Sequence, residues 1–472
     1  MGGARAQERT IEVWDPASGE PVGQVAAAGP AEVERAVAAA AAGQRDWARR
    51  DPGERGRCLA AAAEAVVARA PELAELQTRE NGRPVGESLA GVLAGAGTLE
   101  EFARLGPLHG GGSLRGGWDA LDVVLPEPRG VAAALVPWND PIAIACGPIG
   151  ACLATGNALV LKPSEKTPLS SVLLGEVVAE HLPPGVLTVL TGGPETGRLL
   201  VRADEVGVVL HTGSVATGRE VAAVCGERLV KVVAELGGKD PLVVDEDVDP
   251  GWAAGQAASG AFANAGQVCT SVERIYVHER VAAPFVEALV ARAEALVPGH
   301  GLDAGTTLGP LIDERQREIV RGHVDEARER GARVLFGGRA AAGPGWFFEP
   351  TVLLGAEDDM AVMRQETFGP VAAVRVVRDF DEGLAAADAG DYGLAATVLT
   401  ASQARAQRAV RELRVGTVKV NAVWGGAPGG SAEPRKASGI GLGYGPGLMD
   451  EVTARKVVHL APADRFDAPS RG

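Results

Sequence analysis

The chain has 472 residues, of which 46% are apolar and 23% are charged, and its formal net charge is −15. Domains usually hold roughly 100 to 200 residues, so two or more globular domains are expected. The negative charge opposes binding to a phosphate backbone, and no local run of Lys or Arg offsets it. Nucleic acid is therefore excluded as an expected partner.

The sequence shows no sign of secretion, membrane insertion or metal binding. Its N-terminal stretch lacks the apolar segment of a signal peptide, and Pro and Asn interrupt the apolar stretch over 131–161. The five cysteines show no close pairing, and the seven histidines are scattered without the spacing of helical metal ligands. We expect a cytoplasmic protein without a membrane segment, a disulfide framework or a metal site.

The first hundred residues are expected to be helical. Helical patterns cover 30–42 and 54–76, and the second closes toward Asn81-Gly82-Arg83-Pro84, a helix-stop signal. The pattern then changes, because apolar runs at 121–125 and 131–136, flanked by Pro and Gly, are typical of strands.

Strand-like and helix-like segments alternate between residues 158 and 235. The predicted strands are 158–162, 186–190, 206–210 and 229–235, and the predicted helices are 168–181, 195–202 and 215–224. Because these strands are continuously apolar, we expect a parallel, doubly wound sheet covered by helices on both faces.

A second α/β region is expected after Gly237-Gly238. Its predicted helices begin near Trp252, behind the N-cap candidate Asp249, and cover 281–296 and 313–330, while strands are expected at 272–277 and 456–460. The fold class is therefore α/β, with two doubly wound parallel sheets.

One of the five cysteines stands apart from the others. Cys58, Cys146, Cys152 and Cys225 lie among apolar residues and are expected to be small buried hydrophobes. Cys269 lies in the Gly- and amide-rich segment NAGQVCTS just before a strand, where a side chain can face a cleft. It is either a reactive thiol or another buried cysteine, depending on whether its surroundings favour the thiolate.

Two further polar residues follow strands. Glu235 ends an apolar strand, where it is either a base that activates water or a salt-bridged or solvated strand end. Asn139, in PWNDP, either donates its amide to a developing negative charge or forms an ordinary turn.

A phosphate-binding turn is the functional interpretation of HTGSVATG at 211–218. This segment follows an apolar strand and opens a helix, so Ser214 and nearby N–H groups could hold a pyrophosphate, although the segment is not GxGxxG. Lys162, at the end of another strand, is either part of the same site or a solvent-facing side chain.

Six motifs occur together in one order and spacing. They are PWN at 137–139, KPSE at 162–165, TGS at 212–214, ELGGK at 235–239, GQVC at 266–269 and ETFGPV at 366–371. In this combination the chain resembles the aldehyde dehydrogenase superfamily, of the non-acylating type, over nearly its whole length.

The resemblance implies two Rossmann-like domains and a small β oligomerisation arm. By similarity, residues 1–118 and 131–236 form the NAD-binding domain, residues 237–445 form the catalytic domain, and residues 119–130 and 446–472 form the bridging arm. Such arms join subunits by sheet extension, so a homodimer or homotetramer is expected.

The resemblance also implies the chemistry. Cys269 corresponds to the nucleophile that attacks a small-molecule aldehyde, and the Asn139 amide with the Cys269 N–H meets the resulting oxyanion. Glu235 corresponds to the base that activates the water that hydrolyses the thioester to the acid.

The expected cofactor is NAD. The residues that match the family's cofactor-binding positions are Val136, Trp138, Lys162, Glu165, Ser214, Glu366 and Phe368. Lys162 and Glu165 resemble the pair at the adenine-side ribose, and Glu366 with Phe368 resembles the nicotinamide-end pair. NAD is favoured over NADP because the Glu165 carboxylate would repel a 2′-phosphate.

Two departures from the family leave the substrate open. The chain has GGSAEPRKASGIG where relatives usually have a Pro-Phe-Gly-Gly segment, so the loop over 425–441 is expected to be reshaped. Asp140 stands where relatives often carry an aromatic residue. It either faces the substrate tunnel and favours a cationic aldehyde or caps the following helix from outside.

Three rival functions remain. Glu235 argues against an acylating enzyme that uses coenzyme A, since such enzymes generally lack this base. The presence of Cys269, Glu235, Asn139 and Glu366 together argues against a silent binding protein. An alcohol dehydrogenase is disfavoured because the GxGxxG fingerprint and a zinc-ligand set are lacking.

Overall fold

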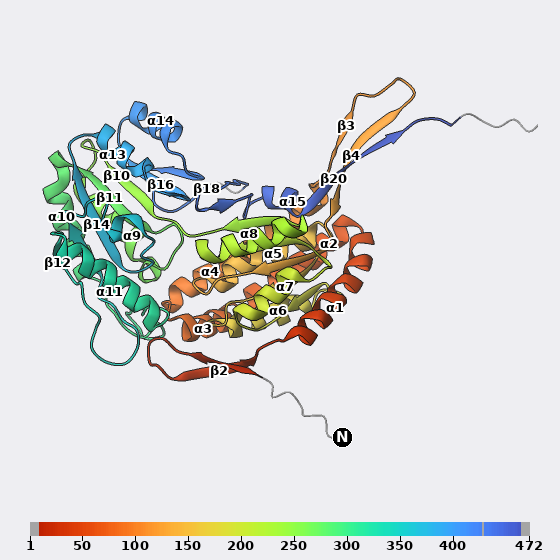
Figure 1. Ribbon diagram of the computed structural model, residues 1–472, viewed down its shortest axis with the longest axis horizontal. Coiled ribbons are helices and arrows are strands. Elements are labelled where there is room, and N and C mark those ends of the chain that lie inside the picture. Colours follow the sequence, from red (N-terminus) through yellow and green to blue (C-terminus); the bar gives the residue numbers. More distant parts are fainter. Residues whose placement is uncertain (1–8, 427–428, 464–472) are drawn as a thin grey trace, which may run out of the picture.

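The computed structural model describes residues 9–426 and 429–463, which form two α/β lobes and a projecting β arm (Figure 1). The predicted α/β class with parallel sheets is confirmed. Residues 1–8, 427–428 and 464–472, which fall within ranges assigned above, lie outside the described residues.

The N-terminal region contains a hairpin followed by helices. Strand β1 (Thr10–Trp14) pairs antiparallel with β2 (Pro21–Ala26). The helices are α1 (Pro30–Arg49), α2 (Pro52–Ala68), α3 (Ala70–Asn81), α4 (Val85–Leu105) and the short η1 (Gly106–Leu108). The prediction of a wholly helical start was wrong for the hairpin, whose strands are mostly exposed or half-buried.

The helix-stop signal after residue 80 is confirmed. Helix α3 ends at Asn81, and Gly82 follows with φ +78°, the left-handed conformation that glycine adopts most readily. The helical segment expected over 54–76 is two helices, because the chain leaves the helical conformation at Arg69.

The first lobe contains a six-stranded sheet of order β19-β9-β8-β5-β6-β7. Its parallel strands are β5 (Val131–Leu135), β6 (Ala158–Lys162), β7 (Leu187–Val189), β8 (Val206–Thr212) and β9 (Lys231–Glu235), and β19 (Gly439–Ile440) is antiparallel. The helices between them are α5 (Pro141–Ala154), α6 (Pro168–Ala179), α7 (Pro194–Arg202) and α8 (Val215–Arg228).

Alternating strand residues face two different cores. Ala132 and Ala134 pack with α2, α4, α5 and α6, whereas Val131 and Ala133 pack with α1, α7 and α8. The continuously apolar strands are therefore buried on both faces, as predicted.

The second lobe contains a seven-stranded sheet of order β12-β13-β14-β11-β10-β16-β17. Its strands are β10 (Asp240–Val244), β11 (Val272–His278), β12 (Arg333–Phe336), β13 (Thr351–Leu354), β14 (Val371–Val377), β16 (Ala395–Leu399) and β17 (Thr417–Val420). Its helices are α9 (Pro250–Phe262), η2 (Ala263–Gly266), α10 (Glu279–Glu294), α11 (Glu314–Glu329), α12 (Ala361–Arg364), α13 (Phe380–Asp388) and α14 (Gln403–Glu412). The predicted cap at Asp249 is confirmed, since its carboxylate accepts from the Trp252 N–H at 2.7 Å.

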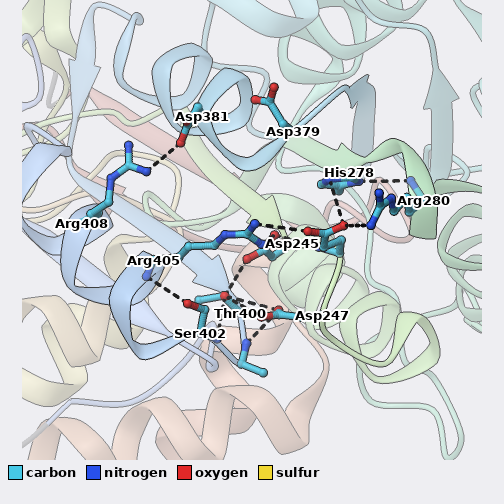
Figure 2. A network of polar contacts seen from close by, with 12 residues as sticks. Asp245, Asp247, His278, Arg280, Asp379, Asp381, Thr400, Ser402, Arg405 and Arg408 are labelled. Carbon is cyan, nitrogen blue, oxygen red and sulfur yellow. Dashed lines mark hydrogen bonds and ion pairs between the residues drawn. The ribbon is translucent and has the colours of Figure 1, made fainter.

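A polar network fixes the ends of two neighbouring strands of this sheet, β10 and β16. Asp245, just after β10, is fully buried and accepts from Arg405 Nη1 at 2.6 Å and from Thr400 Oγ1 at 2.7 Å (Figure 2). Arg405 lies on α14, and Thr400 follows β16. Both oxygens of Asp245 have partners, so the network ties helix α14 to the sheet.

The projecting arm is a three-stranded antiparallel sheet of order β20-β4-β3 (Figure 1). Strand β4 (Leu121–Pro128) pairs along its whole length with β20 (Thr453–Leu460), and β3 (Gly112–Leu114) adds a strand that lies before the range expected for the arm. Helix α15 (Gly447–Glu451) lies within residues 446–472, which were assigned to the arm, but it packs into the first lobe through Leu448 and Met449. None of the helices in residues 9–426 and 429–463 has an apolar stretch long enough to span a bilayer.

Candidate active site

A cavity of about 330 Å3 is lined by segments of both lobes. The predicted site residues on its wall are Trp138, Asn139, Ser214, Glu235, Cys269, Glu366 and Phe368. Val136, Lys162 and Glu165 are not part of this wall. Segments far apart in the sequence thus bring most of the expected residues into one space.

Cys269 follows a turn of left-handed residues. Asn264 has φ +48° and Ala265 has φ +53°, conformations that non-glycine residues rarely adopt. Gly266 follows with φ +74°, and a Cβ there would lie 2.0 Å from the Gly369 carbonyl oxygen. This turn closes α9 and places Cys269 at the cavity wall, before strand β11.

The thiol of Cys269 lies among acidic groups. Burial raises the pKa of the Cys269 thiol to about 12, and the carboxylates of Asp240, Glu235 and Glu366 act in the same direction. The thiol is therefore protonated at neutral pH in this state, and it must lose its proton before it can act as a nucleophile.

Asn139 is held beside the cysteine turn through both its side chain and its backbone. Its Nδ2 donates to the Gln267 carbonyl at 3.0 Å. Its own carbonyl accepts from Asn264 Nδ2 at 3.2 Å and from Asn81 Nδ2 at 3.3 Å. The amide is thereby tied to the turn that carries Cys269.

Glu235 ends strand β9 at the cavity wall. Its Oε1 accepts from the Gly443 N–H at 3.0 Å, and none of the described residues forms a salt bridge with it. Burial raises the pKa of Glu235 to about 8, an effect that the Gly443 N–H opposes. This environment does not match a salt-bridged strand end, and it is suited to a carboxylate that gains and loses a proton near neutral pH.

The segment 366–368 is anchored by a buried ion pair. The Glu273 carboxylate on β11 accepts from the Thr367 N–H at 2.7 Å and from the Phe368 N–H at 2.9 Å. Lys239 pairs with Glu273 and also donates to Thr367 Oγ1 at 2.9 Å. Phe368 is thereby held with φ +50°.

Side chains of this segment reach the cavity. Glu366 Oε1 accepts from the Gly238 N–H at 3.0 Å, and a Cβ on Gly237 would lie 2.4 Å from the other carboxylate oxygen. The Phe368 ring stands edge to face against Trp138, with 5.4 Å between the centroids.

The remaining predicted cofactor residues surround the carboxyl ends of the first sheet. Lys162 is buried, and its Nζ donates to the Pro163 carbonyl at 2.7 Å, so it is not a solvent-facing side chain. Burial lowers the pKa of Lys162 to about 8, and Glu165 acts in the opposite direction. Ser214 is the N-cap of α8, and its Oγ accepts from the Thr217 N–H at 3.3 Å.

Comparison with known proteins decides the family. The aldehyde dehydrogenase family model matches residues 4–458. Betaine aldehyde dehydrogenase from Cereibacter sphaeroides is 40% identical over 464 residues, which are 97% of this chain and 95% of that protein. The chain belongs to the aldehyde dehydrogenase family.

Solved structures extend the similarity of this aldehyde dehydrogenase to three dimensions. Betaine aldehyde dehydrogenase from Staphylococcus aureus in complex with NAD+ is 30% identical with a TM-score of 0.94, over 97% of this chain and 93% of that one. An E. coli NADP-dependent enzyme is 33% identical with a TM-score of 0.94, over 96% and 95% of the two chains.

Several residues at the site of this aldehyde dehydrogenase were not predicted. Gln316 on α11 donates to the Thr367 and Phe368 carbonyls at 2.8 and 3.1 Å. Lys166 pairs with Asp313 at 2.5 Å and lies 5.4 Å from the Trp138 ring centroid. Glu273 carried a usable signal, because it is a carboxylate inside a strand expected to be buried. Gln316 and Lys166 carried none.

Both interpretations of Asp140 were wrong. Asp140 occupies the N-cap position of α5 but makes no side-chain cap bond, and it does not line the cavity. Its Oδ2 lies 2.6 Å from Arg83 Nη1 instead. A cation 57 positions earlier in the chain had no sequence pattern linking it to Asp140.

The altered loop near the end of this aldehyde dehydrogenase is tied to the second lobe. Strand β18 (Arg435–Lys436) pairs with β15 (Tyr392–Gly393). Lys436 Nζ donates to the Asp388 and Gly390 carbonyls at 2.7 and 3.0 Å. The loop then runs through β19 to Gly443, which contacts Glu235, so its course bears directly on the active site.

Proposed function

We propose that this enzyme oxidises an aldehyde to the carboxylic acid with NAD, using Cys269 as the nucleophile, Asn139 as the oxyanion donor and Glu235 as the general base. The observation that supports it best is the meeting of these three side chains, from three separate segments, at one cavity. A thiol, an amide donor and a carboxylate whose pKa is near neutral are the groups that this chemistry needs.

The residues on the cofactor side fit a dinucleotide. Gly213 and Ser214 line the cavity at the start of the 14-residue helix α8, whose N-terminal N–H groups favour a pyrophosphate. Strand β5 lies between β6 and β8, and its Leu135 is paired in register with Lys162 of β6 and with His211 of β8. Both ring nitrogens of buried His211 lack hydrogen-bond partners among the described residues, which leaves polar capacity for a ligand.

We assign the cofactor contacts by the resemblance to the family, with which these positions agree. Lys162 and Glu165 would hold the adenine-side ribose, and Ser214 the pyrophosphate. Glu366 and Phe368 would hold the nicotinamide end. Val136 and Trp138 belong to the strand end and loop beside them.

Carbon–sulfur bond formation begins the reaction. The Cys269 thiol gives its proton to solvent and its sulfur attacks the aldehyde carbon, while the Asn139 amide and the Cys269 N–H stabilise the oxygen that becomes negative. Bound NAD supplies the acceptor for the hydride that leaves this carbon. A thioester between the substrate and Cys269 results.

Water completes the reaction. Glu235 removes a proton from a water molecule, which attacks the thioester carbon and releases the acid and the thiol. The Gly443 N–H holds the carboxylate at this position without a neutralising cation. Glu235 can therefore take up and release a proton within each cycle.

Cofactor choice and substrate are narrower proposals. The Glu165 carboxylate favours NAD by repelling a 2′-phosphate. The relatives named betaine aldehyde dehydrogenase make betaine aldehyde the first substrate to test.

A turnover assay tests this function. Purified protein is given NAD or NADP with betaine aldehyde and with aliphatic, aromatic, amino- and semialdehydes, and reduced cofactor and free acid are measured. We expect NAD-dependent acid formation without coenzyme A, and a loss on the order of 10³-fold or more in Cys269→Ala. Activity retained in Cys269→Ala would exclude this mechanism, and Cys58→Ala serves as the matched cysteine control.

A further inference from the structure

Behind the Asn139 loop, outside the cavity wall, lies a cluster of three charged side chains. Arg83, in the turn between α3 and α4, has its Nη1 2.6 Å from Asp140 Oδ2 and its Nε 3.4 Å from Glu87 Oε2. Arg83 is mostly buried, with 14% of its side chain exposed. One cation is therefore shared by two carboxylates on different segments.

Each of the two carboxylates lies next to a segment that carries a proposed catalytic residue. Asp140 directly follows Asn139 in the chain. Glu87 Oε2 accepts from the Asn264 N–H at 3.0 Å, at the start of the left-handed turn before Cys269. Arg83 thus connects the loop of the oxyanion donor to the turn of the nucleophile.

The fold leaves room for this bridge. A Cβ on Gly91 of α4 would lie 2.8 Å from Asp140 Oδ1 and 3.2 Å from Arg83 Nη1, so the pair packs closely against this glycine. Asn81, at the end of α3, donates to the Asn139 carbonyl from the same side. Asn81 at the end of α3 and Arg83 before α4 therefore both hold the Asn139 loop, the first through the Asn139 carbonyl and the second through Asp140.

Without Arg83, the two partly buried carboxylates would keep only neutral hydrogen-bond donors among the described residues, which are the Asn264 N–H for Glu87 and the Gln77 side-chain amide for Asp140. Burial raises the pKa of Glu87, and Arg83 is the largest influence in the opposite direction. Removing one partner of a buried ion pair leaves an uncompensated charge, which destabilises the arrangement of the segments that carry it.

We propose that Arg83 is a positioning residue, which sets the placement of the Asn139 amide relative to Cys269 through its contacts with Asp140 and Glu87. This inference rests on the proposed function, because it assumes that Asn139 and Cys269 act together. It also assigns Asp140 a structural partner, so the Asp140 charge is not a selector for cationic aldehydes.

Kinetic analysis of Arg83→Met tests the proposal, with Arg83→Lys, Asp140→Asn and Asn139→Ala as companions. A displacement of about 1 Å at a reacting group lowers turnover by up to about 100-fold. We expect Arg83→Met to lower kcat and kcat/KM together by roughly 10- to 100-fold, with KM and the Kd for NAD within about twofold of wild type. Arg83→Lys should recover part of the loss.

A double-mutant cycle separates positioning from general damage. If Arg83 acts through Asn139, Arg83→Met should lower kcat/KM by no more than about threefold in the Asn139→Ala background. The matched control is Arg79→Met, which removes an exposed ion pair with Glu75 on α3 and should leave kcat/KM and Tm unchanged. If Arg83→Met does not fold, Arg83→Lys and Asp140→Asn carry the same comparison.

The outcomes are distinct. Full additivity with Asn139→Ala, or wild-type kcat in both Arg83→Met and Asp140→Asn, would overturn the positioning role. A loss carried by a weaker Kd for NAD and a higher KM, with kcat unchanged, would overturn it as well. An inactive wild type would instead count against the proposed function.

Discussion

At the residue scale, the raised pKa of Glu235 bears directly on its proposed role as the general base. Its side chain must be ionised to accept a proton from water, and burial raises its pKa to about 8. At pH 6 most of the enzyme therefore carries a protonated Glu235 that cannot serve as a base. As the pH rises through 8, the ionised fraction grows toward one.

We predict that the rate of thioester hydrolysis rises between about pH 6 and 9 with an apparent pKa of about 8. Glu235→Gln should lower this rate by roughly 10²- to 10⁴-fold and remove the titration. Stopped-flow measurement of NADH formation at saturating NAD and aldehyde separates hydrolysis from the earlier steps. Glu318→Gln, which changes a more exposed carboxylate on α11, is the control, and an identical pH profile in Glu235→Gln would refute the assignment.

At the scale of elements, the projecting β arm is a part of the fold that exposes apolar side chains. Strands β4 and β20 pair with each other but project from the lobes (Figure 1). Leu121, Leu125, Val457 and Leu460 on these strands expose between 45% and 66% of their surface. Sheet edges with exposed apolar side chains are sites at which other chains pair.

We propose that this arm joins subunits, and we predict a homodimer or homotetramer by light scattering after size-exclusion chromatography. A Val457→Asp, Leu460→Asp variant should shift the protein toward a smaller species, because two buried charges oppose the interface. The matched variant is Val410→Asp on α14, where an exposed valine outside the arm is changed. A wild-type monomer, or an unchanged mass in the arm variant, would exclude this role.

At the scale of the whole molecule, the predictable features are those with a local pattern. The five parallel strands of the first sheet are apolar runs and were located within a few residues, whereas of the seven strands of the second sheet only β11 was predicted. The β1–β2 hairpin was missed because its strands show no apolar run. The split of 54–76 at Arg69 was missed although Pro71, in the first turn of α3, marks it, because a Pro inside a helical pattern ends the helix before it.

Long-range polar contacts are the part of the site that the sequence did not predict. Five of the six motifs contain residues that the fold gathers on the cavity wall, and KPSE at 162–165 does not. The pair of Arg83 with Asp140 and that of Lys239 with Glu273 join positions with no shared local pattern. Such pairs depend on tertiary packing, so they were found only in the three-dimensional structure.

The central claim is that the substrate is carried on Cys269 and released by Glu235. Intact-protein mass spectrometry of Glu235→Gln, incubated with NAD and the best aldehyde, tests it most directly. We predict about one NADH per active site and a chain that gains the mass of the acyl group, mapped to Cys269, with no gain in Glu235→Gln, Cys269→Ala. Sustained turnover by Glu235→Gln at the wild-type rate, or an acyl group on another residue, would contradict the account.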